Sequence, residues 1–156
     1  HAANATMIDS DNVHLLCPAW PGATASLPQH ARPQPGAHGA ATGILQVTVF
    51  PLRERATPQL LDFCRHRMAP TLLRGGARQL AWFCTEHSPN TFVRLPVREG
   101  EPVLVGLALF GDEAALQSFG DSGAWARDVV PGLAPWLAAE PEVLRPQPTA
   151  RSTLHA

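Results

Sequence analysis

The stretch VLVGLALF, residues 103–110, is apolar at every one of its positions. Successive side chains of an extended strand point to opposite faces of a sheet, so this strand presents an apolar set on each face. Strands of this kind are normally covered on both sides. Any fold of this chain must therefore bury both sets. One consists of Val103, Val105, Leu107 and Leu109, and the other of Leu104, Gly106, Ala108 and Phe110.

The residues before this strand predict a strand, a helix and a second strand. ILQVTVFPL, residues 44–52, is rich in β-branched residues and alternates in polarity, which is typical of a half-buried strand. Thr57 and Pro58 have the pattern of an N-cap and a first helical residue, and Gly75 provides the end of that helix. ARQLAWFCTEH, residues 77–87, is typical of a further strand.

The residues after the apolar strand complete the pattern. Asp112 is expected to cap a second helical region, which Pro131 and Pro135 divide into short pieces, and EVLRP at 142–146 predicts a brief last strand. The order of elements predicts an α+β fold, a ferredoxin-like plait with an antiparallel sheet. Both helices of a plait pack on one face, so the second apolar face of 103–110 needs another cover. We therefore expect a homodimer that pairs sheet to sheet.

The chain before residue 44 has a different character from the domain at 44–156. Residues 18–43 hold five prolines and four glycines with little apolar content, which predicts a poorly ordered linker. Residues 1–17 form a separate N-terminal piece, and DNVHLLCPA, residues 11–19, has a short strand-like run.

Charge and hydropathy exclude two classes of partner. Twelve Lys and Arg residues oppose 13 Asp and Glu residues without any basic cluster, so we expect no nucleic acid and no anionic membrane as partners. No apolar run approaches the roughly 20 residues of a membrane span, and the N-terminus lacks the pattern of a signal peptide.

The cysteines predict neither a metal site nor a disulfide framework. Cys17, Cys64 and Cys84 lie far apart in the sequence and form no CxxC pair. The last two lie in apolar segments, as small buried residues do. An odd number of thiols favours reduced cysteines and a cytoplasmic protein. His66 has no second histidine at metal-ligand spacing and is expected on the surface, so no metal is predicted.

Three segments resemble a known family. TEHSPNTFVRLPVREGEPVLVGLALF at 85–110, SGAWARDVVPGLAPWL at 122–137 and PTARSTL at 148–154 are similar to the NIPSNAP family, within the dimeric α/β-barrel superfamily. The resemblance covers residues 44–154 and implies two plaits paired sheet to sheet. AANATMIDSDNVHLLCPA, residues 2–19, is similar to the end of a preceding unit of the same kind, in which case DNVHLLCP and PEVLRPQP would be equivalent pieces.

The resemblance implies no single activity. Neighbouring barrel families include cofactor-independent monooxygenases, haem-degrading oxygenases and dehalogenase-like enzymes, and a fold alone does not supply a function. The Asn, Trp and His constellation of the haem-degrading relatives is not recognisable at matching spacing, so no cofactor is expected.

Two arginines form the first candidate site. If residues 92–98 are extended, Arg94 and Arg98 share a face with each other and could clamp a carboxylate or phosphate. In the structural alternative, Arg98 pairs with Glu99 or Glu101, and Arg94 pairs with Glu86 or faces solvent.

His87, Asn90 and Trp82 form a second candidate group near a strand end, where His87 or Asn90 could assist proton transfer. Alternatively, His87 caps the turn before Pro89. Gly106 is the third candidate, because a glycine inside a buried strand leaves space for a bulge or for a ligand.

Two functions follow as hypotheses. The first is a barrel module that assembles sheet to sheet and binds a small hydrophobic molecule without catalysis. The alternative is a cofactor-independent oxygenase acting on such a molecule between sheet and helices. A closed apolar cavity reached by His87 favours the enzyme, whereas a cavity filled by side chains favours the module. Trp125 and Trp136 are expected to fill the core or an interface rather than to hold a cofactor.

Overall fold

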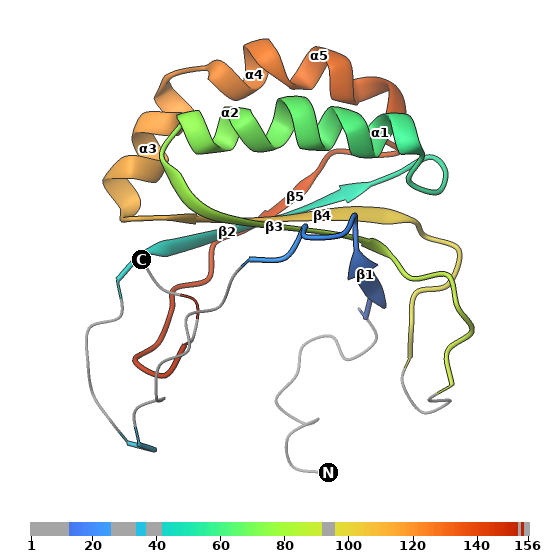
Figure 1. Ribbon diagram of the computed structural model, residues 1–156, viewed down its shortest axis with the longest axis horizontal. Coiled ribbons are helices and arrows are strands. Elements are labelled where there is room, and N and C mark those ends of the chain that lie inside the picture. The colour runs from blue at the N-terminus through green and yellow to red at the C-terminus, as the bar shows by residue number, and fades with distance from the viewer. Residues whose placement is uncertain (1–12, 26–33, 37–41, 92–95, 153, 155–156) are drawn as a thin grey trace.

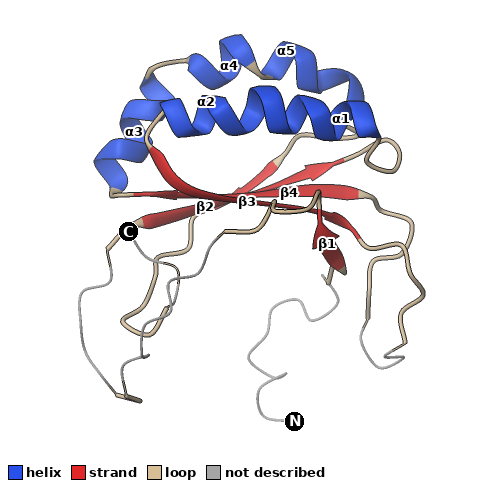
Figure 2. Cartoon of the chain, viewed as in Figure 1, coloured by secondary structure: helices blue, strands red, loops and turns tan. Residues whose placement is uncertain are grey.

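The computed structural model describes residues 13–25, 34–36, 42–91, 96–152 and 154. The fold is α+β, with a five-stranded antiparallel sheet in the order β1-β3-β4-β2-β5. All of the helices lie on one face of this sheet (Figure 1), and Figure 2 shows the same two layers coloured by secondary structure. The strands are β1 (Leu16–Pro18), β2 (Ile44–Pro51), β3 (Ala77–Thr85), β4 (Val103–Phe110) and β5 (Glu142–Leu144).

The helical layer consists of two continuous stretches. The first contains α1 (Pro58–Phe63), the π-helical turn η2 (Cys64–Met68) and α2 (Ala69–Arg74). The second contains α3 (Glu113–Asp121), α4 (Ala124–Asp128), α5 (Val130–Leu133) and the 3-10 turn η3 (Ala134–Trp136). The strands β2 to β5 with these helices follow the predicted order and are compatible with a ferredoxin-like plait.

The first helical stretch begins and ends where the sequence predicts. Thr57 is the N-cap, and its side-chain oxygen accepts a hydrogen bond from the Leu60 N–H at 3.3 Å. Gly75 is the C-cap, and Gly76 follows with a φ of +98°, a left-handed conformation that favours glycine.

The π-helical turn η2 inside this stretch has a local cause. Pro70 has no N–H to donate, and its ring clashes with the carbonyl of the residue four positions earlier in an ideal α-helix. The chain widens by one residue at this point, so that the Ala69 N–H donates to the Cys64 carbonyl. The helix thus continues through Pro70 instead of ending there.

The two faces of β4 divide as the alternation predicts. Leu104, Ala108 and Phe110 belong to the main core cluster beneath the helices. Cross-strand register places Leu107 opposite Val47 and Ala81 on the other side, which we call the helix-free face. No helix covers this face in the described part of the chain (Figure 1).

The start of the expected linker is ordered, which corrects the prediction for residues 18–25. The Ala19 N–H donates to the Trp82 carbonyl at 3.0 Å, and the Trp82 N–H donates to the Ala23 carbonyl at 2.8 Å. Ala19 and Ala23 are buried. Composition missed this because only one large apolar residue, Trp20, attaches the segment to the sheet, together with two small alanines and backbone hydrogen bonds.

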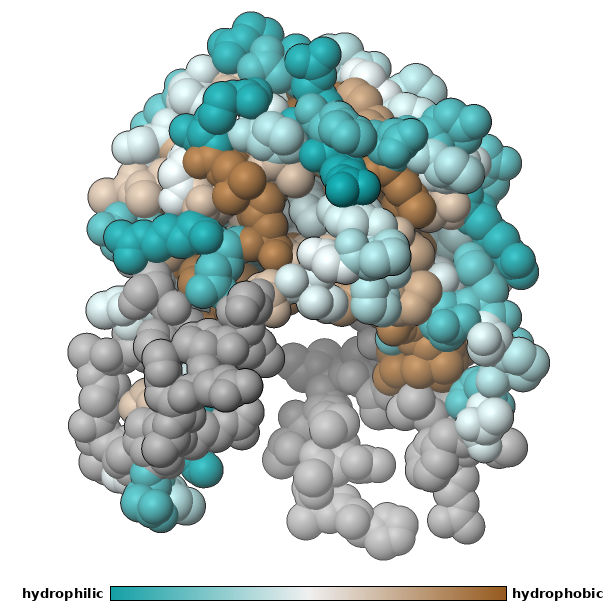
Figure 3. Space-filling model, viewed as in Figure 1, coloured by the Kyte–Doolittle hydropathy of each residue, from teal (hydrophilic) through white to brown (hydrophobic). Residues whose placement is uncertain are grey.

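Figure 3 shows hydrophilic residues over the outer surface of the helical layer and hydrophobic residues beneath them, toward the sheet. In the described part of the chain, no helix is both long and apolar enough to cross a membrane.

Candidate functional site

A cleft of about 640 Å³, lined mostly by polar residues, lies at one end of the sheet. Three segments form its walls: residues 53–55 after β2, residues 85–90 at the end of β3, and residues 97–102 before β4. Leu15 contributes from the N-terminal segment. Because the walls come from four separate parts of the chain, only the folded protein brings these groups together.

Backbone hydrogen bonds hold the N-terminal segment between two walls of the cleft. The Glu86 N–H donates to the Leu15 carbonyl at 2.8 Å, and the Arg98 N–H donates to the Val13 carbonyl at 2.9 Å. Val13 also forms a parallel bridge with Val97. Residues 13–15 therefore link the end of β3 to the segment that leads into β4.

The structure favours the ion-pair interpretation of Arg98. Arg98 Nη1 lies 3.1 Å from Glu101 Oε2, and both side chains are exposed. An exposed pair of this kind contributes at most about 1 kcal/mol to stability. Arg94, the other member of the predicted clamp, lies outside the described residues, so the structure does not test the pairing of the two arginines.

Glu86 is fixed by the turn that follows it. The Ser88 N–H donates to Glu86 Oε1 at 2.8 Å. This backbone hydrogen bond is the main reason that the pKa of Glu86 lies below its usual range, with a smaller contribution from the nearby His87. Glu86 thus caps the turn before Pro89, the role that the sequence offered to His87 as an alternative.

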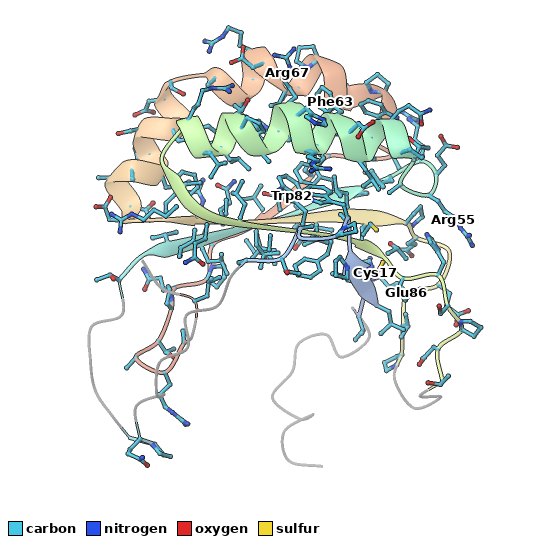
Figure 4. The ribbon with its side chains drawn as sticks, in the orientation of Figure 1. Cys17, Arg55, Phe63, Arg67, Trp82 and Glu86 are labelled. Carbon is cyan, nitrogen blue, oxygen red and sulfur yellow. The ribbon has the colours of Figure 1, made fainter. Side chains whose placement is uncertain are left out.

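Arg53 and Arg55 also line the cleft and were missed by the sequence reasoning. Within the described residues, neither guanidinium group has an ion-pair partner. Figure 4 shows Arg55 on the loop after β2, at the same end of the molecule as Glu86. The sequence does show charged residues directly after the strand that ends near residue 52. No spacing rule, however, indicates that residues 53–55 lie beside residues 85–102 in the fold.

The predicted group of His87, Asn90 and Trp82 does not line one cavity. His87 and Asn90 line the cleft, and His87 is exposed. Trp82 is only 2% exposed and belongs to the core on the helix side (Figure 4). His87 and Asn90 therefore line the cleft without Trp82, so the three residues do not share one cavity.

The space predicted beside Gly106 is occupied by Trp82. A Cβ atom at Gly106 would lie 2.6 Å from Trp82 Cζ3, far closer than a Cβ normally approaches another atom. The free space that remains there is about 10 Å³, lined among others by Thr48, Leu72 and Trp125. That is about enough for one water molecule and too little for a small hydrophobic substrate. Gly106 is present for packing, and the cavity interpretation is wrong.

Trp82 packs beside further aromatic rings, one from the N-terminal segment and one from β2. The ring centroids of Trp20 and Phe50 each lie 6.4 Å from that of Trp82, in stacked orientations. Trp125 lies 6.3 Å from Phe50, and Trp136 lies 5.5 Å from Phe63. Trp125 and Trp136, both partly buried, thus pack against the core, in line with the prediction.

Two further residues that the sequence analysis considered, His66 and Cys64, lie outside the cleft. His66 is exposed, with Nδ1 3.0 Å from the Asp62 carbonyl oxygen. Cys64 is fully buried, and this burial strongly raises the pKa of its thiol. Among the described residues, no group of three or more His, Cys, Asp or Glu side chains is placed to hold a metal ion.

Comparison with known proteins returned no match to a protein-family model, to a curated protein or to a solved structure. Three arginines and four glutamates are among the residues that line the cleft. Among the described residues, the lining of the cleft pairs no nucleophile with a base within hydrogen-bond distance.

Proposed function

We propose that this chain is an assembly module, similar to the NIPSNAP family, that pairs with a second copy through the helix-free faces of the two sheets. The apolar character of that face supports the proposal. Cross-strand register aligns Leu45 with Leu109, Val47 with Leu107, and Val49 with Val105. Three strands thus present a largely apolar surface that includes Ala81 and Phe83 of β3, with Gln79 as a polar residue opposite Leu109.

The chain itself covers this face incompletely. Val105 and Leu109 are buried, at 6% and 1% exposure, whereas Val47, Val49 and Leu107 are only half-buried. Fully burying such a side chain contributes about 1.5–3 kcal/mol. A second sheet would complete this burial, and its own face would gain the same cover, as a two-fold interface requires.

The two edges of the sheet support the same arrangement. β1 pairs with β3 at one edge, and β5 pairs with β2 at the other. Val143 and Leu144 of β5 remain about half exposed, at 48% and 47%. Leu144 stands opposite Val47 on the helix-free face, so a second sheet would cover this side chain as well.

The filled space beside Gly106 supports a module rather than the alternative oxygenase. Such an enzyme needs an enclosed apolar cavity next to its acid or base. Trp82 occupies that volume, and His87 lies on the exposed cleft at the end of the sheet. A small hydrophobic ligand would instead bind between the paired sheets.

One set of three variants tests the proposal. Leu107→Asp places a charge on the helix-free face, and Leu73→Asp places the same charge on an exposed position of α2, where the side chain is 51% exposed. Light scattering after gel filtration should give twice the 16.7 kDa chain mass for the unmodified protein and for Leu73→Asp. Leu107→Asp should remain folded by circular dichroism and elute as a single chain.

Ala108→Asp is the contrasting variant, because Ala108 lies in the core beneath the helices. A buried, unpaired charge should unfold the protein rather than only separate the copies. A Leu107→Asp protein that keeps the mass of the unmodified protein would refute the proposal.

A further inference from the structure

Cys17 and Cys84 lie directly opposite each other on neighbouring antiparallel strands, β1 and β3. Their sulfur atoms are 3.7 Å apart, and both cysteines are free thiols. The sequence spacing predicts no disulfide framework, and the two thiols, 67 residues apart, meet because β1 adds to the edge of the sheet beside β3.

The register makes this position suitable for a disulfide. Hydrogen bonds join Glu86 to Leu15 on one side of the pair and Ala19 to Trp82 on the other. At steps of two residues, this places Cys17 and Cys84 at a hydrogen-bonded pair position, where Cα atoms are about 5.5 Å apart. That spacing lies within the range of about 4.4–6.8 Å found in disulfides.

We propose that Cys17 and Cys84 form a reversible disulfide site that fastens the N-terminal strand to the sheet. The sulfur atoms must approach from 3.7 Å to a bond length of roughly 2.05 Å, through side-chain rotation and a small approach of the two strands. Cys64 takes no part, since it is fully buried in the helical core.

The reaction requires an oxidant, for which we take a small disulfide such as glutathione disulfide. The Cys17 thiolate, on the outer strand, attacks one sulfur of the oxidant, and one glutathione leaves as a thiolate that takes up a proton. The Cys84 thiolate then attacks the Cys17 sulfur of the mixed disulfide, and the second glutathione leaves. Two protein thiols are oxidised, and one glutathione disulfide is reduced to two thiols.

Cys84 is suited to the second step. Burial, with the neighbouring Cys17 thiol, raises the pKa of Cys84 to about 11, so only a small fraction of Cys84 is thiolate at neutral pH, and this fraction attacks the sulfur already held beside it. Ring closure should therefore become faster as the pH rises toward that pKa. The closed disulfide would hold β1, and with it the wall of the cleft at Leu15.

Mass spectrometry tests this site on the unmodified chain. After incubation with glutathione disulfide and alkylation of the remaining thiols, the digest should contain a peptide linking Cys17 to Cys84, and the intact chain should lose the mass of two hydrogen atoms. Dithiothreitol should restore both thiols, and Cys64 should be alkylated only after denaturation.

Two variants separate the steps. Cys84→Ser should retain glutathione on Cys17 as a stable mixed disulfide, and Cys17→Ser, on the outer strand, should leave Cys84 largely unmodified. Persistent glutathionylation of Cys17 in the unmodified chain, two thiols that stay alkylatable, or a link to Cys64 would each overturn the proposal.

Discussion

The indole ring of Trp82 packs directly on the backbone of Gly106, its cross-strand partner in β4. This contact allows a tryptophan that is only 2% exposed to lie between the sheet and the helices. It also closes the space in which a small substrate could have bound.

Gly106→Ala should therefore destabilise the protein. The new methyl group would lie 2.6 Å from Trp82 Cζ3, and overpacking of this kind typically costs about 1–3 kcal/mol. Urea unfolding measures the change in the free energy of unfolding. Gly120→Ala is the matched control, because nothing lies within 4 Å of that position in α3. It should be stabilising by up to about 1 kcal/mol. Equal effects at both positions would contradict the packing role of Gly106.

The cap at Thr57 gives a second prediction. Thr57→Ala removes the hydrogen bond from the Leu60 N–H to the Thr57 side chain and should cost about 1 kcal/mol, whereas Thr57→Ser keeps a capping hydroxyl and should cost much less. Thermal unfolding of both variants checks the difference. If serine were as destabilising as alanine, the loss would have to come from the methyl group instead of the cap.

Glu86 should give stability a specific dependence on pH. Its pKa is lowered in the folded protein, chiefly by the Ser88 N–H, so the folded state holds the proton less tightly than the unfolded state does. The contribution of the carboxylate is present above the unfolded pKa of about 4.3 and is lost as the pH falls through the folded pKa.

Denaturant titrations across this acid range check the assignment of Glu86. Glu86→Gln should be less stable than the unmodified protein at neutral pH, and the difference should shrink below about pH 4. A carbon-13 NMR titration of the Glu86 carboxyl group should give a midpoint below the usual value. A difference between the two proteins that stays constant with pH would argue against the turn cap.

The elements within residues 44–146 could be predicted from the sequence because each has a local signal. Thr57 and Asp112 act as N-caps as predicted, and Asp112 Oδ1 accepts from the Ala115 N–H at 2.8 Å. The alternation in β4 also assigned Leu107 and Ala108 to opposite faces correctly.

Contacts between distant segments could not be predicted in this way. The pairing of β1 with β3 depends on backbone hydrogen bonds that any residues could make, so composition indicated a linker at Ala19 and Ala23. The meeting of Cys17 with Cys84 follows from the same pairing. Arg53 and Arg55 line the cleft because of the path of the loop after β2, and the periodicity of the sequence does not predict that path.

The pairing of two sheets is the central proposal, and sedimentation equilibrium of the unmodified chain tests it most directly. Obligate interfaces often bury more than about 2,000 Å² and persist on dilution. We expect a single species of twice the 16.7 kDa chain mass at micromolar concentration, unchanged by added reductant, since the Cys17–Cys84 site lies within one chain. A folded, stable species of 16.7 kDa at the same concentration would contradict the pairing of helix-free faces.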